Sequence, residues 1–141
     1  MNAVLFQENA NMSNTKNIVL VVDDSPSIRK EVRVILEKDG YIVREAGSEF
    51  GMLSAIEEYG EKADIVLMDL SLNDANGFDL VSRLRAAEKY RNIPVIILTE
   101  HADRDSVLMA KMVGVQGYLV KPIIADLLRE RIRKVSMGED G

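Results

Sequence analysis

Five polar residues each end, or directly follow, an apolar segment of the sequence. They are Asp23, Asp24, Asp69, Thr99 and Lys121. Carboxylates held close together repel one another, and a hard divalent cation with oxygen ligands relieves the repulsion, so Mg²⁺ is the expected ion. One carboxylate could then attack a phosphoryl donor, while an ammonium and a hydroxyl stabilise the oxygens of the transferred group. This chemistry requires a fold that brings the five residues together.

Apolar runs before these residues predict the strands that position them. Ile18 to Val22 is continuously apolar and stops at Asp23, as expected for a strand buried on both faces. The segment that ends before Asp69 has the same character, whereas the alternation in residues 41–46 is weaker. We expect strands over residues 18–22, 41–46, 64–68, 93–98 and 117–120.

Apolar residues at helical spacing fill the intervals between the expected strands. Ser25 can cap the first helix, Pro26 suits its first position, and Gly40 closes it. Strands that alternate with helices indicate a parallel sheet covered on both faces, in one of a few doubly wound α/β folds. Ligands of such sheets bind beyond the carboxyl ends of the strands, where the polar residues should converge. Further helices are expected around residues 50–56, 78–84, 107–113 and 124–135.

The composition narrows the classes of function. The chain has 141 residues, which suits a single domain, and its net charge of -5 argues against direct binding of nucleic acid. It has no cysteine and only one histidine, which excludes disulfides, thiolate catalysis and multi-histidine metal sites. No apolar run approaches the roughly 18 residues of a membrane helix. No secretory signal is visible either, so we expect no membrane insertion and a cytoplasmic location.

We divide the chain into three parts. Residues 1–16 are expected to form a flexible N-terminal tail, because residues 7–17 are rich in Asn, Ser and Thr and have no apolar period. Residues 17–136 hold the strand–helix units and form the domain. Residues 137–141 make a short polar C-terminal tail.

Three further motifs accompany the acidic residues: Val-Val-Asp-Asp-Ser at 21–25, Gly77, and Pro122 directly after Lys121. Together with Asp69 and Thr99, they resemble the receiver domain of two-component response regulators, of the chemotaxis-regulator kind. Each motif alone is weak, but their order, at successive strand ends over most of the chain, is specific. The resemblance implies a flavodoxin-like, doubly wound sheet of five parallel strands in the order 2-1-3-4-5, with five helices.

The resemblance also implies roles for the acidic residues. Asp69 would be the aspartate that is phosphorylated, with Mg²⁺ as the cofactor. Asp24 would bind Mg²⁺ directly and Asp23 mostly through water. Asp69 and the backbone carbonyl of Ser71 would complete the protein ligands. Such a protein catalyses only its own phosphorylation and dephosphorylation, so it is a signalling module and not a true enzyme.

The remaining site residues would neutralise the phosphate or change conformation when it is present. Lys121 would pair with it, across a cis peptide bond to Pro122. Thr99 and Tyr118 would be the switch pair, in which Thr99 turns toward the phosphoryl group and the Tyr118 ring moves into the vacated space. For Tyr118, simple core packing stays open as an alternative, because aromatic residues are common in strands.

The family resemblance implies two kinds of protein partner. The phosphoryl donor would be a sensor histidine kinase or a histidine phosphotransfer protein, and the signal would pass to a downstream effector protein or domain. The expected partner face is the fourth helix, fifth strand and fifth helix, through which a dimer could also form. Whether the chain acts alone or within a longer regulator stays open. Four apolar residues of the fourth helix suit either the core or this face: Leu108, Met109, Met112 and Val113.

Two positions depart from the family pattern. Glu100 follows the threonine where a small residue is usual, and Asn73 stands where proline is frequent. A carboxylate at position 100 could repel the incoming phosphoryl group. We therefore expect Glu100 and His101 to tune how fast water attacks the acyl phosphate.

Two other functions fit parts of the pattern. A flavodoxin-like binder of a nucleotide or flavin needs a loop after the first strand that cradles phosphate, but here that loop carries Asp23 and Asp24, which would repel it without a metal. A magnesium-dependent aspartyl phosphatase usually carries a second acid two residues after its nucleophile, where this chain has Ser71. Both alternatives are therefore disfavoured.

Overall fold

The strands begin and end close to where the apolar runs predict. The computed structural model describes residues 17–138. All neighbouring strands are parallel, in the order β2-β1-β3-β4-β5, which confirms the predicted topology. The strands are β1 (Ile18–Val22), β2 (Ile42–Ala46), β3 (Ala63–Asp69), β4 (Val95–Thr99) and β5 (Gly117–Val120).

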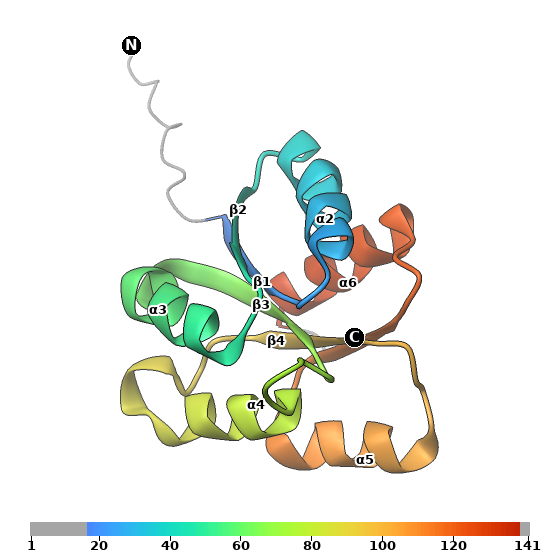
Figure 1. Cartoon of the computed structure of the whole chain (residues 1–141). Coiled ribbons are helices and arrows are strands. Elements are labelled where there is room, and N and C mark those ends of the chain that lie inside the picture. The colour runs from blue at the N-terminus through green and yellow to red at the C-terminus, as the bar shows by residue number, and fades with distance from the viewer. Residues whose placement is uncertain (1–16, 139–141) are drawn as a thin grey trace.

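Helices cover both faces of this sheet, as the doubly wound fold requires. Figure 1 shows α2 and α6 on one face and α3, α4 and α5 on the other. The two buried clusters divide in the same way, because α2 and α6 contribute to one cluster, and α3 and α4 to the other. The α-helices of the described residues are α2 (Pro26–Lys38), α3 (Glu49–Tyr59), α4 (Gly77–Ala86), α5 (Arg104–Val113) and α6 (Ala125–Ser136). Two short 3₁₀ helices that the sequence did not predict are η1 (Gly60–Lys62) and η2 (Glu88–Tyr90).

The continuous apolar character of β1 follows from its central place in the sheet. Val19 and Val21 pack with the residues of α2 and α6, whereas Leu20 and Val22 pack with those of α3 and α4. Every residue of β1 is buried. Because successive side chains point to opposite faces, a strand covered on both sides needs apolar residues at every position.

The ends of the first helix match the sequence signals. The Ser25 side chain accepts a hydrogen bond from the backbone N–H of Ile28 at 3.3 Å, and Pro26 occupies the first helical position. The helix ends at Lys38, and Gly40 follows with a φ of 91°. This left-handed conformation favours glycine, so the predicted end of the helix is confirmed.

Several boundaries differ from the prediction by one to three residues. β4 begins at Val95 and not at position 93, because Pro94 has no N–H to donate and the N–H of Ile93 bonds to the carbonyl of Tyr90 in a turn. α5 begins at Arg104, earlier than its apolar period indicates, because Asp103 caps a polar first turn. β3 extends by one residue at each end, from 63 to 69.

Some expectations fall outside the described part of the chain. The predicted N-terminal tail, residues 1–16, lies outside it, as do residues 139–141. Among residues 17–138, no helix combines the length and apolar character needed to cross a membrane.

Gly77 lets the start of α4 approach the end of β3. Its N–H donates a hydrogen bond of 2.8 Å to the carbonyl of Leu70. A Cβ atom at this position would lie 2.4 Å from the backbone oxygen of Asp69 and 3.0 Å from the Cα of Leu70. These atoms belong to the backbone, so the contact cannot be relieved by rotating a side chain. The end of β3, which carries Asp69, therefore packs directly against Gly77.

The substitution Gly77→Ala should therefore lower the free energy of unfolding by about 2 kcal/mol or more, because it forces the backbone after Asp69 to move. Urea unfolding followed by circular dichroism measures the change. Ser82→Ala, at an exposed position of the same helix, is the control and should stay within about 0.5 kcal/mol of the parent. Equal stability of Gly77→Ala and the control would contradict the close approach.

Candidate metal centre

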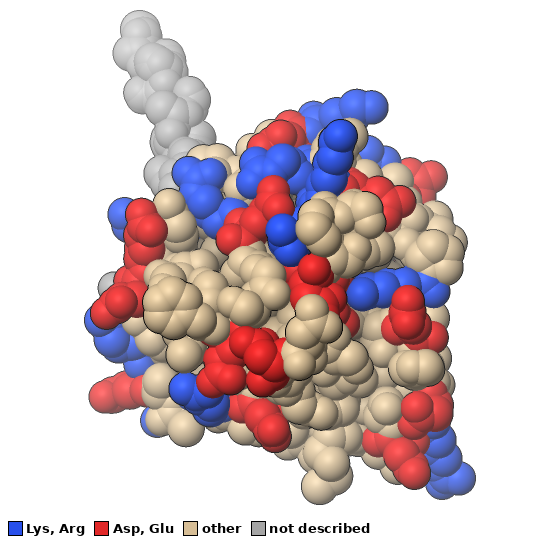
Figure 2. All heavy atoms as spheres, viewed as in Figure 1, with Lys and Arg blue, Asp and Glu red and all other residues tan. Residues whose placement is uncertain are grey.

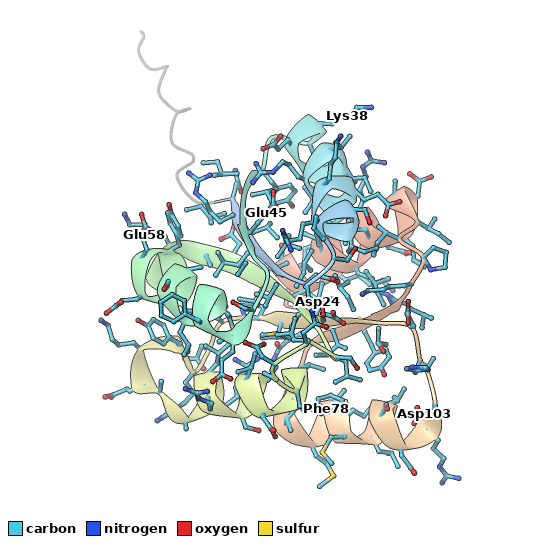
Figure 3. The ribbon with its side chains drawn as sticks, in the orientation of Figure 1. Asp24, Lys38, Glu45, Glu58, Phe78 and Asp103 are labelled. Carbon is cyan, nitrogen blue, oxygen red and sulfur yellow. The ribbon has the colours of Figure 1, made fainter. Side chains whose placement is uncertain are left out.

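The polar residues of the motifs meet at the carboxyl edge of the sheet. β1 is followed by Asp23 and Asp24, β3 and β4 end in Asp69 and Thr99, and Lys121 follows β5. Figure 3 labels Asp24 at the centre of this edge, beside the ends of β1 and β3. The fold therefore brings together the residues that the sequence places at strand ends.

Three carboxylates form the centre of the site. Asp23, Asp24 and Asp69 each offer an oxygen, and these oxygens all lie within 4.8 Å of one another. Asp23 is fully buried, Asp69 is 4% exposed and Asp24 is half-buried. Short turns orient the buried pair: the N–H of Ser25 donates to Asp23 Oδ1 at 2.9 Å, and the N–H of Ser71 to Asp69 Oδ1 at 3.2 Å.

Lys121 faces two of the carboxylates. Its Nζ lies 2.8 Å from Asp23 Oδ2 and 3.5 Å from Asp69 Oδ1. The peptide bond to Pro122 is cis, as the family resemblance implies, and the N–H of Lys121 donates to the carbonyl of Thr99 at 2.7 Å. The ammonium is thus held on the side of the acidic centre that β5 supplies.

The electrostatics of the centre are those of an incompletely neutralised acidic cluster. Burial, together with the negative charges of Asp23 and Asp24, raises the pKa of Asp69 to about 6, and Lys121 and the Ser71 N–H only partly oppose the shift. Burial alone would lower the pKa of Lys121, but Asp23 and Asp69 outweigh it and raise that pKa. Lys121 therefore stays charged, while Asp69 holds its proton more tightly than an exposed aspartate does.

The donor set fits a hard divalent cation. Three carboxylates face one ammonium, so a net negative charge remains at a largely buried position. Asp23 Oδ2 is buried and accepts no hydrogen bond of ordinary geometry, although the Lys121 ammonium is nearby. Oxygen donors without nitrogen or sulfur ligands suit Mg²⁺ better than zinc. Asp23, Asp24, Asp69 and the neighbouring Ser71 are the residues that could hold it.

A cavity of about 580 Å³ opens over this centre. It is large enough to admit a phosphorylated group and the water around it. Ser27 and Ile28 line it although sequence reasoning did not select them for the site, and so does Pro122 of the Lys121–Pro122 motif. The first two occupy the first turn of α2, which directly follows the acidic pair, so their position in the chain could have indicated them. The other lining residues are Asp24, Ser25, Asp69, Ser71, Thr99, Glu100, His101 and Lys121.

Thr99 and Tyr118 both bond to the backbone of His101. The buried Thr99 side chain accepts a hydrogen bond from the N–H of His101 at 3.1 Å. The Tyr118 hydroxyl donates to the carbonyl of His101 at 3.0 Å, while its ring packs partly against the core. The predicted switch pair is thus connected through one residue of the loop before α5.

Some apolar residues of α5 lie in the core and others on the surface, so both predicted environments occur. Leu108, Met109 and Met112 are exposed, whereas Val113 packs against the core. Val120 and Ile124, at the end of β5 and before α6, are also exposed. An exposed apolar surface therefore accompanies α5, β5 and the start of α6.

Comparison with known proteins agrees with the fold and identifies a family. Residues 19–133 match the response regulator receiver domain family. The chemotaxis protein CheY of Pseudomonas aeruginosa is 31% identical over 117 residues, which cover 83% of this chain and 94% of that protein. CheY1 of Helicobacter pylori is 35% identical over 120 residues, with 83% and 94% covered.

Solved structures give the same result. The chemotaxis protein CheY4 of Vibrio cholerae superposes with a TM-score of 0.80 at 30% identity, over 86% of this chain and 99% of that one. A CheY-like receiver domain protein of Methanospirillum hungatei has a TM-score of 0.79 at 26% identity, over 88% and 96%. The chain belongs to the response regulator receiver domain family, whose CheY-like members are phosphoacceptor signalling switches and not classical enzymes.

Proposed function

We propose that Asp69 accepts a phosphoryl group from a sensor histidine kinase or a histidine phosphotransfer protein, in a reaction that requires Mg²⁺. The observation that carries this proposal is the position of Asp69, which is 4% exposed, shares an acidic centre with Asp23 and Asp24, and lies 3.5 Å from the Lys121 ammonium. A carboxylate so placed has both a neighbouring metal site and a cation that can neutralise a transferred phosphate.

The chemistry assigns a task to each residue. One Asp69 oxygen attacks phosphorus, an O–P bond forms, the P–N bond of the donor phosphohistidine breaks, and the electron pair leaves with the imidazole. Lys121 neutralises phosphoryl oxygens, and the Thr99 hydroxyl donates to one of them. Bound by Asp23, Asp24, Asp69 and the carbonyl of Ser71, Mg²⁺ would supply charge stabilisation for the transferring group. Attack by water on phosphorus later releases phosphate and restores the carboxylate.

The hydrogen bonds around His101 support Thr99 and Tyr118 as the switch pair. When the Thr99 hydroxyl turns to the phosphoryl group, it gives up the bond that it accepts from His101. The Tyr118 ring, whose hydroxyl now bonds to the carbonyl of His101, then moves toward the vacated space. Phosphorylation can shift this equilibrium only by as much as it favours one of the two arrangements.

The exposed apolar residues of α5 and its neighbours support an output surface. A downstream effector would bind the face formed by α5, β5 and α6, through which the protein could also dimerise.

The receiver unit would comprise residues 17–136, between two tails, and would act in the cytoplasm without direct contact with nucleic acid or insertion into membranes. The net charge of -5 agrees with a protein partner and not a nucleic acid.

Incubation with Mg²⁺ and acetyl phosphate should add one phosphoryl group, detected by intact mass. Asp69→Asn should remove the adduct because it removes the nucleophile, and a chelator should remove it in the parent because the acidic centre is then uncompensated. Asp79→Asn, an exposed change in the first turn of α4, is the matched control and should accept the group normally. A parent protein without an adduct would contradict the proposed function.

The raised pKa of Asp69 predicts how stability depends on pH without metal. The carboxyl has a pKa of 3.8 when unperturbed and about 6 in the folded protein. Above the folded value, the fold carries an unfavourable charge; as the pH falls from about 6 to about 4, the folded state takes up a proton and the penalty disappears. Asp69→Asn should thus stabilise the Mg²⁺-free protein by about 2 kcal/mol at about pH 8, and less on acidification.

Denaturant unfolding in a chelator, repeated across this pH range, measures the difference for Asp69→Asn. The exposed Asp79→Asn change again serves as the control and should give no stabilisation at any pH. A variant at position 69 that gains nothing over the parent at about pH 8 would show that the acidic centre is not repulsive.

Glu100 should slow the entry of anionic phosphodonors, because it is exposed and lines the cavity above Asp69. Glu100→Ala should speed phosphorylation by acetyl phosphate on the order of threefold, as expected for one exposed charge of under about 1 kcal/mol. The gain should shrink as salt is added. Alanine at position 100 or 101 should also change the half-life of the phosphorylated protein.

The rates come from stopped-time samples analysed by intact mass. Glu88→Ala removes the same charge in η2, which precedes β4 and so lies at the opposite edge of the sheet. That control should phosphorylate at the parent rate. Equal acceleration by both substitutions would assign the effect to net charge, and unchanged half-lives at positions 100 and 101 would end the tuning hypothesis.

A further inference from the structure

Arg29, in the first turns of α2, reaches back across the carboxyl edge of the sheet. Its Nη1 donates a hydrogen bond of 2.7 Å to the backbone carbonyl of Asp23. Its Nε donates to Glu45 Oε1 of β2 at 2.9 Å, and its side chain is 20% exposed. One guanidinium therefore connects the loop after β1 to the neighbouring strand. Figure 2 shows Lys and Arg side chains gathered around the position where Figure 3 labels Glu45.

The space that Arg29 occupies exists because position 47 has no side chain. A Cβ atom on Gly47 would lie 2.9 Å from Arg29 Nη1 and 3.8 Å from the carbonyl oxygen of Asp23. Gly47 does not have a positive φ, so its backbone does not itself require glycine. The loop after β2 thus leaves room for the guanidinium at the point where it meets the Asp23 carbonyl.

Three polar groups of Asp23 make hydrogen bonds, whereas the Asp24 carboxylate makes none to any described residue. The N–H of Asp23 donates to the carbonyl of Ala46 at 3.0 Å, its Oδ1 accepts from Ser25 at 2.9 Å, and its carbonyl accepts from Arg29. In residues 17–138, the Asp24 carboxylate makes no hydrogen bond or ion pair. Its position therefore depends on the backbone that carries it.

The planarity of the peptide bond transmits the Arg29 contact to Asp24. The Asp23 carbonyl and the Asp24 N–H belong to one planar unit, so a donor that holds the carbonyl also limits the rotation of the unit that carries the Asp24 Cα. We propose that Arg29 is a positioning residue of the metal centre, which keeps the Asp24 carboxylate within reach of those of Asp23 and Asp69. The proposal rests on the proposed function, in which these carboxylates hold Mg²⁺.

The sign of the effect separates positioning from simple charge. A guanidinium close to a cation site repels the cation, so loss of its charge alone would tighten Mg²⁺ binding. Loss of a positioning contact has the opposite effect, because the ligands are no longer held in place before the ion binds. Weaker binding after removal of Arg29 is therefore a result that charge alone does not produce.

The chain offers a matched control in Arg33. This residue also pairs with Glu45, at 2.6 Å, and with Glu37 at 2.6 Å, and it lies one turn further along α2. It makes no hydrogen bond to the Asp23 backbone among the described residues. Arg33→Gln thus removes a positive charge and surface ion pairs from the same network without touching the acidic loop.

Calorimetric titration of the full chain with MgCl₂ tests the proposal, with thermal unfolding of each variant in parallel. Arg29→Gln should raise the Kd for Mg²⁺ on the order of tenfold, the usual effect of losing an outer partner of a metal ligand. Gly47→Ala keeps the charge but displaces the guanidinium, and should weaken binding in the same direction. Arg33→Gln should leave the Kd unchanged. If Arg29→Gln does not fold, Gly47→Ala against Arg33→Gln carries the test.

The outcomes keep this inference apart from the proposed function. Tighter or unchanged Mg²⁺ binding in both Arg29→Gln and Gly47→Ala, with a parent that accepts a phosphoryl group, overturns the positioning role and leaves the function standing. A parent that binds no Mg²⁺ overturns both. Weaker binding, together with normal phosphorylation of Arg29→Gln when Mg²⁺ is raised to saturation, supports the role of Arg29 in holding the centre.

Discussion

Repulsion among three carboxylates at one edge of the sheet is the constraint on which the rest of the structure depends. Asp23 and Asp69 are buried and Asp24 is half-buried, yet Lys121 is the one cation in ion-pair contact with them among residues 17–138. Burying an uncompensated charge is costly, and the raised pKa of Asp69 expresses that cost directly. A proton or a divalent cation would relieve it, and the two compete for the same oxygens.

The apolar strands hold the carboxylates together against this repulsion. The register of β1 and β3 pairs Val22 with Met68, so the next residues along both strands, Asp23 and Asp69, come side by side. A slip of one residue would move every side chain of a strand into the opposite buried cluster and disrupt the packing of both, so the register is strongly constrained. The strain of the acidic centre therefore has to be relieved by ligands and protons and not by movement of the backbone.

Sequence reasoning could place this centre because it depends on strand ends. Apolar runs fixed the ends of β1 and β3 closely, and parallel order then required Asp23 and Asp69 to meet. The start of β4 was less predictable, because Ile93 is apolar but its N–H closes a turn before Pro94. Short 3₁₀ helices carry no apolar period, so η1 and η2 gave no signal.

Contacts between distant loops were outside the reach of pattern analysis. Nothing in the local sequence indicates that Arg29 bonds to the Asp23 carbonyl beside Gly47, because the three positions meet only once α2 and β2 are packed. The output face was similarly undetermined. The helical period of α5 leaves Met109 and Met112 in either environment, and only the packed structure exposes them.

A second half-buried cation shows why the two edges of the sheet differ in chemistry. Arg85, in the last turn of α4, donates to the backbone carbonyls of Ile93 at 2.7 Å and Gly114 at 2.8 Å. These residues precede β4 and β5, so Arg85 lies at the amino edge, where it bonds to carbonyls and, among residues 17–138, to no carboxylate. Burial accordingly lowers the pKa of Arg85, whereas carboxylates raise that of Lys121.

Backbone carbonyls accept hydrogen bonds from the guanidinium of Arg85 and hold it in place, although they do not neutralise its charge. At the carboxyl edge, no cation besides Lys121 pairs with the three carboxylates within the described part of the chain, so negative charge remains in excess. At the amino edge, Arg85 therefore links α4 to the segment before β4 and to the loop after α5. The carboxyl edge stays open to ions and phosphate. Arg85 at one edge of the sheet therefore has a structural role, whereas Lys121 at the other edge can take part in chemistry.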